Sequence, residues 1–62
     1  MNVYVLTRIS EGDSVVVDGV FPTEKKAEKY KDHLLEEFGI DKKQYEYGNT
    51  EYNWEIHKEK VQ

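Results

Sequence analysis

The most constraining feature of this sequence is a single amphipathic helix whose two ends are both marked. Thr23 is a good N-cap, and Glu24 places a carboxylate in the first turn, where the helix dipole favours it. At the other end, Gly39 suits the left-handed position of a Schellman ending, with Leu35 and Ile40 as its hydrophobic pair. Apolar residues at spacings of three and four predict one buried helix face, made of Ala27, Tyr30, Leu34 and Phe38.

Residues on both sides of this helix have the composition of β-strands. Residues 2–9 and 15–21 are rich in β-branched and aromatic side chains, and the turn cluster 10–14 between them predicts an antiparallel hairpin. Every second residue from Tyr52 to Ile56 is apolar, which predicts a C-terminal strand with one buried face. A right-handed crossover through the helix would place this strand beside the first one. We therefore expect an α+β fold: an antiparallel sheet in the order 2-1-C-terminal, with the helix on one face.

The segment between the helix and the last strand allows two interpretations. Residues 45–47 alternate between Tyr and Glu, and Gly48-Asn49 suits a two-residue hairpin loop that would pair Tyr47 with Thr50. The alternative is an irregular loop followed by one long strand. The pattern favours the terminal hairpin and a ββαββ fold, with ββαβ as the alternative.

Length and composition limit how such a fold is stabilised. The chain has 62 residues, enough for a single domain over residues 1–62, and a domain of that size buries only about 60% of the surface of its unfolded chain. It contains no cysteine, which excludes disulfides and thiolate metal sites. Small domains without such links often gain support from another chain, so we expect a protein partner or a homo-oligomer.

Charge and hydropathy narrow the class of partner and the compartment. The net charge is −4 with acidic and basic residues interleaved, whereas a general nucleic-acid binder carries a clustered basic excess. No apolar run approaches the roughly 20 residues of a membrane span, and no signal-peptide pattern follows Met1. We therefore expect a cytoplasmic protein without a membrane partner.

The first two strands carry more apolar residues than one helix can cover. Alternation divides these residues into two sets, one for each sheet face. We expect the helix to cover the set that contains Val3, Val5, Ile9, Val15 and Val17. The other set would form an exposed patch typical of an interface, unless the tyrosines that follow the helix or the C-terminal tail fold over it. The candidate protein-binding residues are therefore Tyr4, Leu6, Val16, Val20, Tyr45 and Tyr47.

The sequence contains no recognisable set of catalytic or metal-binding residues. His33 has glutamates one helical turn away and His57 alternates with glutamates, but a zinc site needs three or four converging ligands. Ser10 and Ser14 lie in a turn with no histidine at a recognisable spacing, and the glycines form no phosphate-binding loop. We therefore expect no catalytic, cofactor or metal site, and a chain that is not an enzyme.

Two groups of side chains predict alternative functions. Aromatic residues and lysines gather between Lys42 and Lys60, where exposed rings would stack the bases of a single-stranded nucleic acid. The same rings are also suited to the core of a half-buried sheet. Carboxylates four residues apart on the helix form an acidic ridge, which in some acidic proteins imitates a phosphate strand: Glu24, Glu28, Asp32 and Glu36. Lysines interrupt this ridge, which favours a solvated, salt-bridged helix face.

Two runs in the first half of the chain resemble a group of short uncharacterised bacterial and bacteriophage proteins. They are residues 3–7 (VYVLT) and residues 19–28 (GVFPTEKKAE), which resemble the YVLT strand and the GVFST-EEKA strand-to-helix junction of that group. The resemblance implies a ββαβ-type fold and a stand-alone protein, and it carries no activity or functional residues. A phage origin would make binding and inhibition of a host protein plausible by analogy. We therefore predict a small non-enzymatic protein-binding module.

Overall fold

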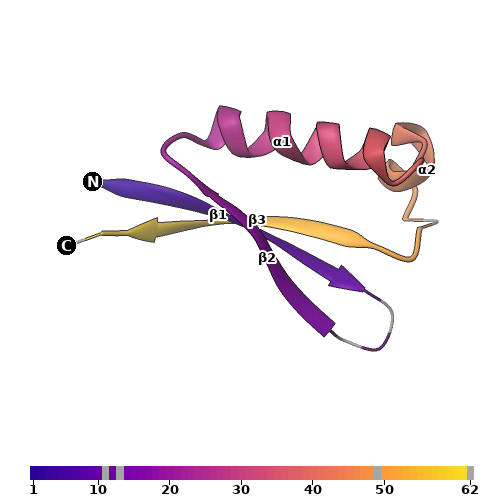
Figure 1. The fold of residues 1–62 in the computed structure, drawn as a ribbon, viewed down its shortest axis with the longest axis horizontal. Helices are drawn as coiled ribbons and strands as arrows, with labels where there is room; N and C mark the ends of the chain where they lie inside the picture. The colour runs from indigo at the N-terminus through magenta and orange to yellow at the C-terminus, as the bar shows by residue number, and fades with distance from the viewer. Residues whose placement is uncertain (11, 13, 49, 62) are drawn as a thin grey trace.

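The computed structural model, which describes residues 1–62 except Glu11, Asp13, Asn49 and Gln62, consists of a sheet covered on one face by helices (Figure 1). Its elements in chain order are β1 (Asn2–Ser10), β2 (Ser14–Phe21), α1 (Glu24–Glu37), α2 (Lys42–Glu46) and β3 (Asn53–Lys60). The three strands form one sheet in the order β2-β1-β3, and β1 pairs antiparallel with both neighbours. The expected α+β class and strand order are therefore confirmed.

Helix α1 begins and ends where its local signals predict. The backbone N–H of Lys26 donates to the Thr23 hydroxyl at 3.2 Å, as expected of an N-cap. At the C-terminal end, Ile40 N–H donates to the Leu35 carbonyl at 2.8 Å and Gly39 N–H donates to that of Glu36 at 3.0 Å. Gly39 has φ +68°, so both bonds of a Schellman ending are present. Within the described residues, no helix is long and apolar enough to span a membrane.

The buried face of α1 differs in part from the expected one. Ala27 and Leu35 are buried, whereas Leu34 is only half-buried. Tyr30 and Phe38 each remain 38% exposed, because their rings lie at the rim of the core and not beneath the helix. The core joins three elements, and its buried cluster consists of Leu6, Leu35 and Trp54.

The register between β1 and β3 decides which sheet face the helix covers. β3 has one apolar face, and the register places Ile56 beside Leu6 and Trp54 beside Arg8. The helix therefore packs on the β1 face that carries Tyr4, Leu6 and Arg8. This corrects the expectation that Leu6 belongs to the uncovered patch, because its side chain is 0% exposed.

A β-bulge in β2 changes which of its valines share a face. Leu6 pairs with Gly19 but the next residue, Thr7, pairs with Val17, so Asp18 is an extra residue in β2. An extra residue reverses the alternation of all positions beyond it. Val16 and Val20, which strict alternation places together, consequently lie on opposite faces of the sheet.

The expected terminal hairpin is wrong, because residues 42–46 form the short helix α2. The carboxylate of Asp41 caps this helix by accepting a hydrogen bond from Lys43 N–H at 2.8 Å. Gly48, whose φ is +76°, follows the C-cap residue Tyr47. Asn49, the second residue of the expected hairpin loop, lies outside the described residues. The fold is thus ββαβ with an added helical turn.

Candidate protein interface

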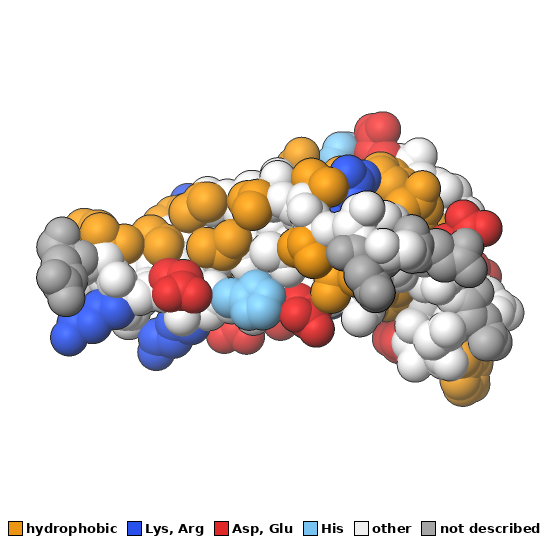
Figure 2. Space-filling view, turned by 90° about the horizontal axis from the view of Figure 1, so that it is seen from below, with side chains coloured by type: hydrophobic (Ala, Val, Ile, Leu, Met, Phe, Trp, Pro, Cys, Tyr) orange, Lys and Arg blue, Asp and Glu red, His pale blue; other side chains and the backbone are white. Residues whose placement is uncertain are grey.

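Aliphatic side chains gather on the sheet face that points away from α1 (Figure 2). Cross-strand partners share a face, so the register places Val20 beside Val5 and Val15 beside Ile9. Val17 lies between these two rows. We call this surface the open face, and its aliphatic members are Val3, Val5, Ile9, Val15, Val17 and Val20.

The β2 side of the open face is strongly exposed. The accessible fractions of Val15, Val17 and Val20 are 62%, 60% and 58%. Within the described part of the chain, both helices lie on the opposite side of the sheet (Figure 1). Monomeric proteins rarely leave a contiguous aliphatic patch in water, and such a patch usually marks an interaction site.

The β3 side of the open face is polar. Glu55, His57 and Glu59 point to this side, because their partners in β1 are Thr7, Val5 and Val3. They form an acidic rim next to the valines, since two of the three side chains are carboxylates. The open face therefore has a neutral apolar centre and one charged border.

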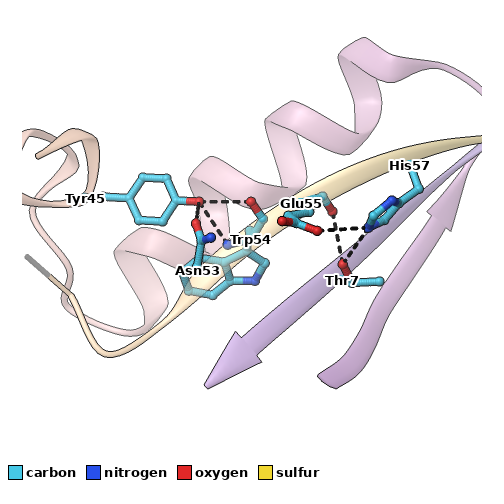
Figure 3. A network of polar contacts seen from close by, with 6 residues as sticks. All are labelled: Thr7, Tyr45, Asn53, Trp54, Glu55 and His57. Atoms are coloured by element: carbon cyan, nitrogen blue, oxygen red, sulfur yellow. Dashed lines mark hydrogen bonds and ion pairs between the residues drawn. The ribbon is translucent and has the colours of Figure 1, made fainter. Parts of the chain in front are cut away.

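Thr7, Glu55 and His57 form a small polar network on this border (Figure 3). The Thr7 hydroxyl lies 3.2 Å from His57 Nε2, and the Glu55 carboxylate lies 3.3 Å from the same nitrogen. A nucleophilic triad needs the carboxylate on one ring nitrogen and the hydroxyl on the other. Because both contacts use Nε2, this network does not have the geometry of a triad.

Metal-ligand geometry is likewise not found on the described residues. His33 has one carboxylate nearby, that of Glu37 at 3.4 Å, and His57 has that of Glu55. No group of three or more His, Asp or Glu side chains converges within the described ranges. These contacts fit paired surface side chains better than a metal centre.

A second cluster, which the sequence analysis did not identify, joins all three strands on the helix side. The bulge residue Asp18 accepts a hydrogen bond from Trp54 Nε1 at 2.8 Å, and its other oxygen lies 3.6 Å from the Arg8 guanidinium. Arg8 also lies 5.0 Å from the ring centroid of Phe38, within the range of a cation–π contact. An Asp-Gly pair inside an apolar strand is the signal that predicts such a bulge.

The candidate residues from the two N-terminal strands do not lie on one surface. Tyr4 and Leu6 face the helix, and Leu6 is part of the core. Val16 is exposed, but it lies on the helix side of the sheet beyond the part that α1 covers. Only Val20 of this set belongs to the open face.

The two candidate tyrosines have different environments. The Tyr45 hydroxyl accepts a hydrogen bond from Trp54 N–H at 2.9 Å and lies 3.1 Å from the Trp54 carbonyl (Figure 3). Tyr45 thus binds both backbone groups of a residue in β3. Tyr47, at the C-terminal end of α2, is 77% exposed. The structure therefore does not bring the two together as one interface.

The aromatic residues proposed for base stacking are mostly part of the core. Trp54 is 4% exposed, and Tyr45 and Tyr52 pack against it. Of the rings in this segment, Tyr47 is the one with most of its surface in solvent. Binding of single-stranded nucleic acid stays a prediction, and fewer rings are exposed for base stacking than the sequence suggested.

The acidic ridge of α1 is exposed along its whole length. Asp32 pairs with Lys42 at 3.8 Å, and the neighbouring His33 pairs with Glu37. Exposed pairs of this kind contribute little to stability. They fit the interpretation of a solvated helix face.

Two of the hollows on the helix side of the molecule are lined mainly by apolar surface. One, of about 400 Å³, lies at the junction of α1 and α2 and is lined by Phe38, Ile40 and Tyr52 among others. The other, of about 450 Å³, lies between Phe21 and Tyr30. Both are within the size range of ligand pockets, but neither is lined by a recognisable set of catalytic groups.

Comparison with known proteins assigns a family but no activity. The family whose model matches residues 1–61 is described as a domain of unknown function (DUF7336). Neither the curated proteins nor the solved structures contain a significant match to this chain.

Proposed function

The chain belongs to the DUF7336 family of unknown function, and we propose that it acts as a non-enzymatic protein-binding module whose binding surface is the open face. The observation that carries this proposal is the row of exposed valines on β2, which continues into the half-buried aliphatic residues of β1. Removing this surface from water would provide the main favourable contribution to binding.

The chemistry of the surface defines the partner it fits. The valines offer no charge and no hydrogen-bonding side chain, so the contacting centre of the partner should be apolar. Glu55 and Glu59 border the same face, and the net charge of the chain is −4. A partner with basic residues beside its apolar centre would therefore be complementary. If the resemblance to bacteriophage proteins extends to function, this partner would be a host protein that binding inhibits.

The test is a charge placed in the centre of the open face. Val20→Lys should leave the fold intact, because the side chain is 58% exposed, and should raise the Kd for the partner at least about tenfold. Tyr47→Lys is the control, since it places the same charge on a more exposed side chain (77%) at the C-terminal end of α2 and not on the sheet. A partner captured by the parent should be retained by Tyr47→Lys, lost by Val20→Lys, and then confirmed with purified proteins by calorimetry.

The opposite pattern would contradict the proposal. If Val20→Lys binds like the parent while Tyr47→Lys does not, binding uses the region of α2. A fluorescent single-stranded oligonucleotide at low salt then tests the nucleic-acid alternative directly. Such binding should weaken strongly as salt is added.

A further inference from the structure

The two outer edges of the sheet belong to β2 and β3, and the backbone groups along them can be assigned. Trp54 directs its N–H and C=O outward, because both lie within hydrogen-bond distance of the Tyr45 hydroxyl. At the far end of the same pair of strands, Val61 N–H donates to the Met1 carbonyl at 2.9 Å. In an antiparallel ladder these orientations alternate, so both observations give the same phase. Odd-numbered residues of β1 point their backbone groups to β3, and even-numbered residues point theirs to β2.

This phase determines which groups of β2 are unpaired. Arg8 is even-numbered and lies opposite Val16, so the backbone groups of Val16 are directed inward to β1. The N–H and C=O of Val15 and Val17 are then directed away from the sheet. Within the described residues, no hydrogen bond from another element reaches either of them. Their side chains are among the most exposed aliphatic groups of the molecule.

Edge strands of this kind usually carry a protective charge, and this segment does not. Charged side chains on an edge normally prevent pairing with another chain. The nearest charge in the strand, Asp18, is turned to the helix side and held by Trp54 and Arg8. The stretch from Val15 to Val17 is consequently neutral on both faces and has free backbone groups between them.

We propose that this edge binds a second copy of the chain, with Val15 of each copy opposite Val17 of the other. A two-fold axis through Val16 places the outward N–H and C=O groups of Val15 opposite those of Val17 in the other copy. The two sheets become one antiparallel six-stranded sheet, with the valines at its centre. The open faces of the two copies then join into one surface with an acidic rim at each end.

The exposed area of the chain supports a second copy as the occupant. A compact monomer of 7.4 kDa exposes about 4,200 Å², whereas this chain exposes 4779 Å². The excess of about 600 Å² approaches the ~800 Å² that each partner buries in a standard interface. Each copy has a net charge of −4, but no like charges meet in the paired stretch, because Val15, Val16 and Val17 are neutral. The proposal does not depend on the proposed function, which concerns the face of the sheet and not its edge.

The first experiment uses a single introduced cysteine, since the chain has none of its own. In Val16→Cys the two thiols of a dimer lie opposite each other at a non-hydrogen-bonded position, where Cα atoms are about 4.5 Å apart, within reach of a disulfide. Diamide should therefore convert this variant rapidly to a covalent dimer. Val20→Cys is the control: this position is more exposed than Val16 (58% against 43%) but lies beyond the bulge, so the variant should remain a monomer on a denaturing gel. Equal, slow cross-linking of both variants would overturn the proposal.

The second experiment is sedimentation over a dilution series. The parent should sediment at twice the 7.4 kDa of the chain and dissociate on dilution. Val17→Pro removes a donor that faces outward, which an edge strand tolerates, and should give a monomer with an unchanged far-UV circular dichroism spectrum. Should this variant not fold, Val17→Lys keeps the N–H and places a charge in the contact, and it should also be monomeric.

Val20→Lys distinguishes an edge contact from a contact between two open faces. It should remain dimeric, because Val20 lies outside the paired stretch. Dissociation of Val20→Lys together with a dimeric Val17→Pro would show that the open faces stack, and would overturn the edge pairing. A parent that is monomeric at its highest soluble concentration would also overturn it, and would leave binding of another protein to the open face intact.

Discussion

The two edges of the sheet differ in how their backbone is protected. The β3 edge is closed at Trp54 by the Tyr45 hydroxyl, and beyond that point it carries four charged residues as far as Lys60: Glu55, Lys58, Glu59 and Lys60. Among the described residues, the β2 edge has neither device between Val15 and Val17. Charges and covering elements prevent a strand from pairing with other chains. We therefore expect another chain to pair with the β2 edge and not with the β3 edge.

The largest expected effect concerns the buried side chain at the protected edge. Trp54→Ala should lower the free energy of unfolding by about 3–5 kcal/mol, because a large core side chain is removed and a cavity remains. Val17→Ala, on the other edge, should change it by less than about 0.5 kcal/mol when measured on the monomer. Urea unfolding followed by circular dichroism would measure both. Similar losses for the two variants would show that the β2 edge also supports the core.

A smaller effect is expected at Asp18, which connects β2 to β3 across the sheet. Asp18→Ala leaves the indole N–H of Trp54 without its acceptor and Arg8 without its carboxylate. The expected cost is about 2 kcal/mol, and Asp18→Asn should cost less because the amide oxygen still accepts from the indole. Trp54 is the one tryptophan of the chain, so its fluorescence reports unfolding directly. Equal losses for the two variants would mean that charge, and not the hydrogen bond, matters at this position.

The smallest effect concerns the closure of the β3 edge itself. Tyr45→Phe keeps the packed ring but removes the hydroxyl, so stability should fall by about 1 kcal/mol and the Trp54 amide should exchange faster with solvent. Hydrogen-exchange NMR would measure this amide. Tyr47→Phe is the matched control, because that ring is 77% exposed, and it should leave both quantities unchanged. Unchanged exchange in Tyr45→Phe would show that the hydroxyl does not protect this edge.

The sequence predicts the existence of an apolar sheet surface, but not which residues form it. The surplus of aliphatic residues in β1 and β2 is visible in the sequence, and it predicts the sheet face over which no helix packs in the described part of the chain. The assignment of residues to that face was wrong at Tyr4, Leu6 and Val16, because the register with β3 puts the helix on the face that carries these three. Val20 alone of the set lies on the open face, because Asp18 is an extra residue in β2 that strict alternation does not include and that reverses the positions on its two sides.

In the segment after α1, the local sequence pattern and the tertiary contacts also favour different structures. Residues 45–47 alternate like a strand, but the Asp41 cap and the packing of Tyr45 against β3 stabilise a helical turn there. A short alternating pattern is weak local information, and contacts with a distant strand outweigh it.

Features that depend on residues adjacent in the sequence could be predicted from the sequence alone. These are the helix with its Thr23 cap and Gly39 ending, the first two strands, and the strand order that follows from short connections. The tertiary structure decided the register, which sets Ile56 beside Leu6, and with it the face that α1 covers and the edge that stays open. Caps and turns are energies of a few adjacent residues, whereas a register is chosen by the whole set of side chains that meet across the sheet.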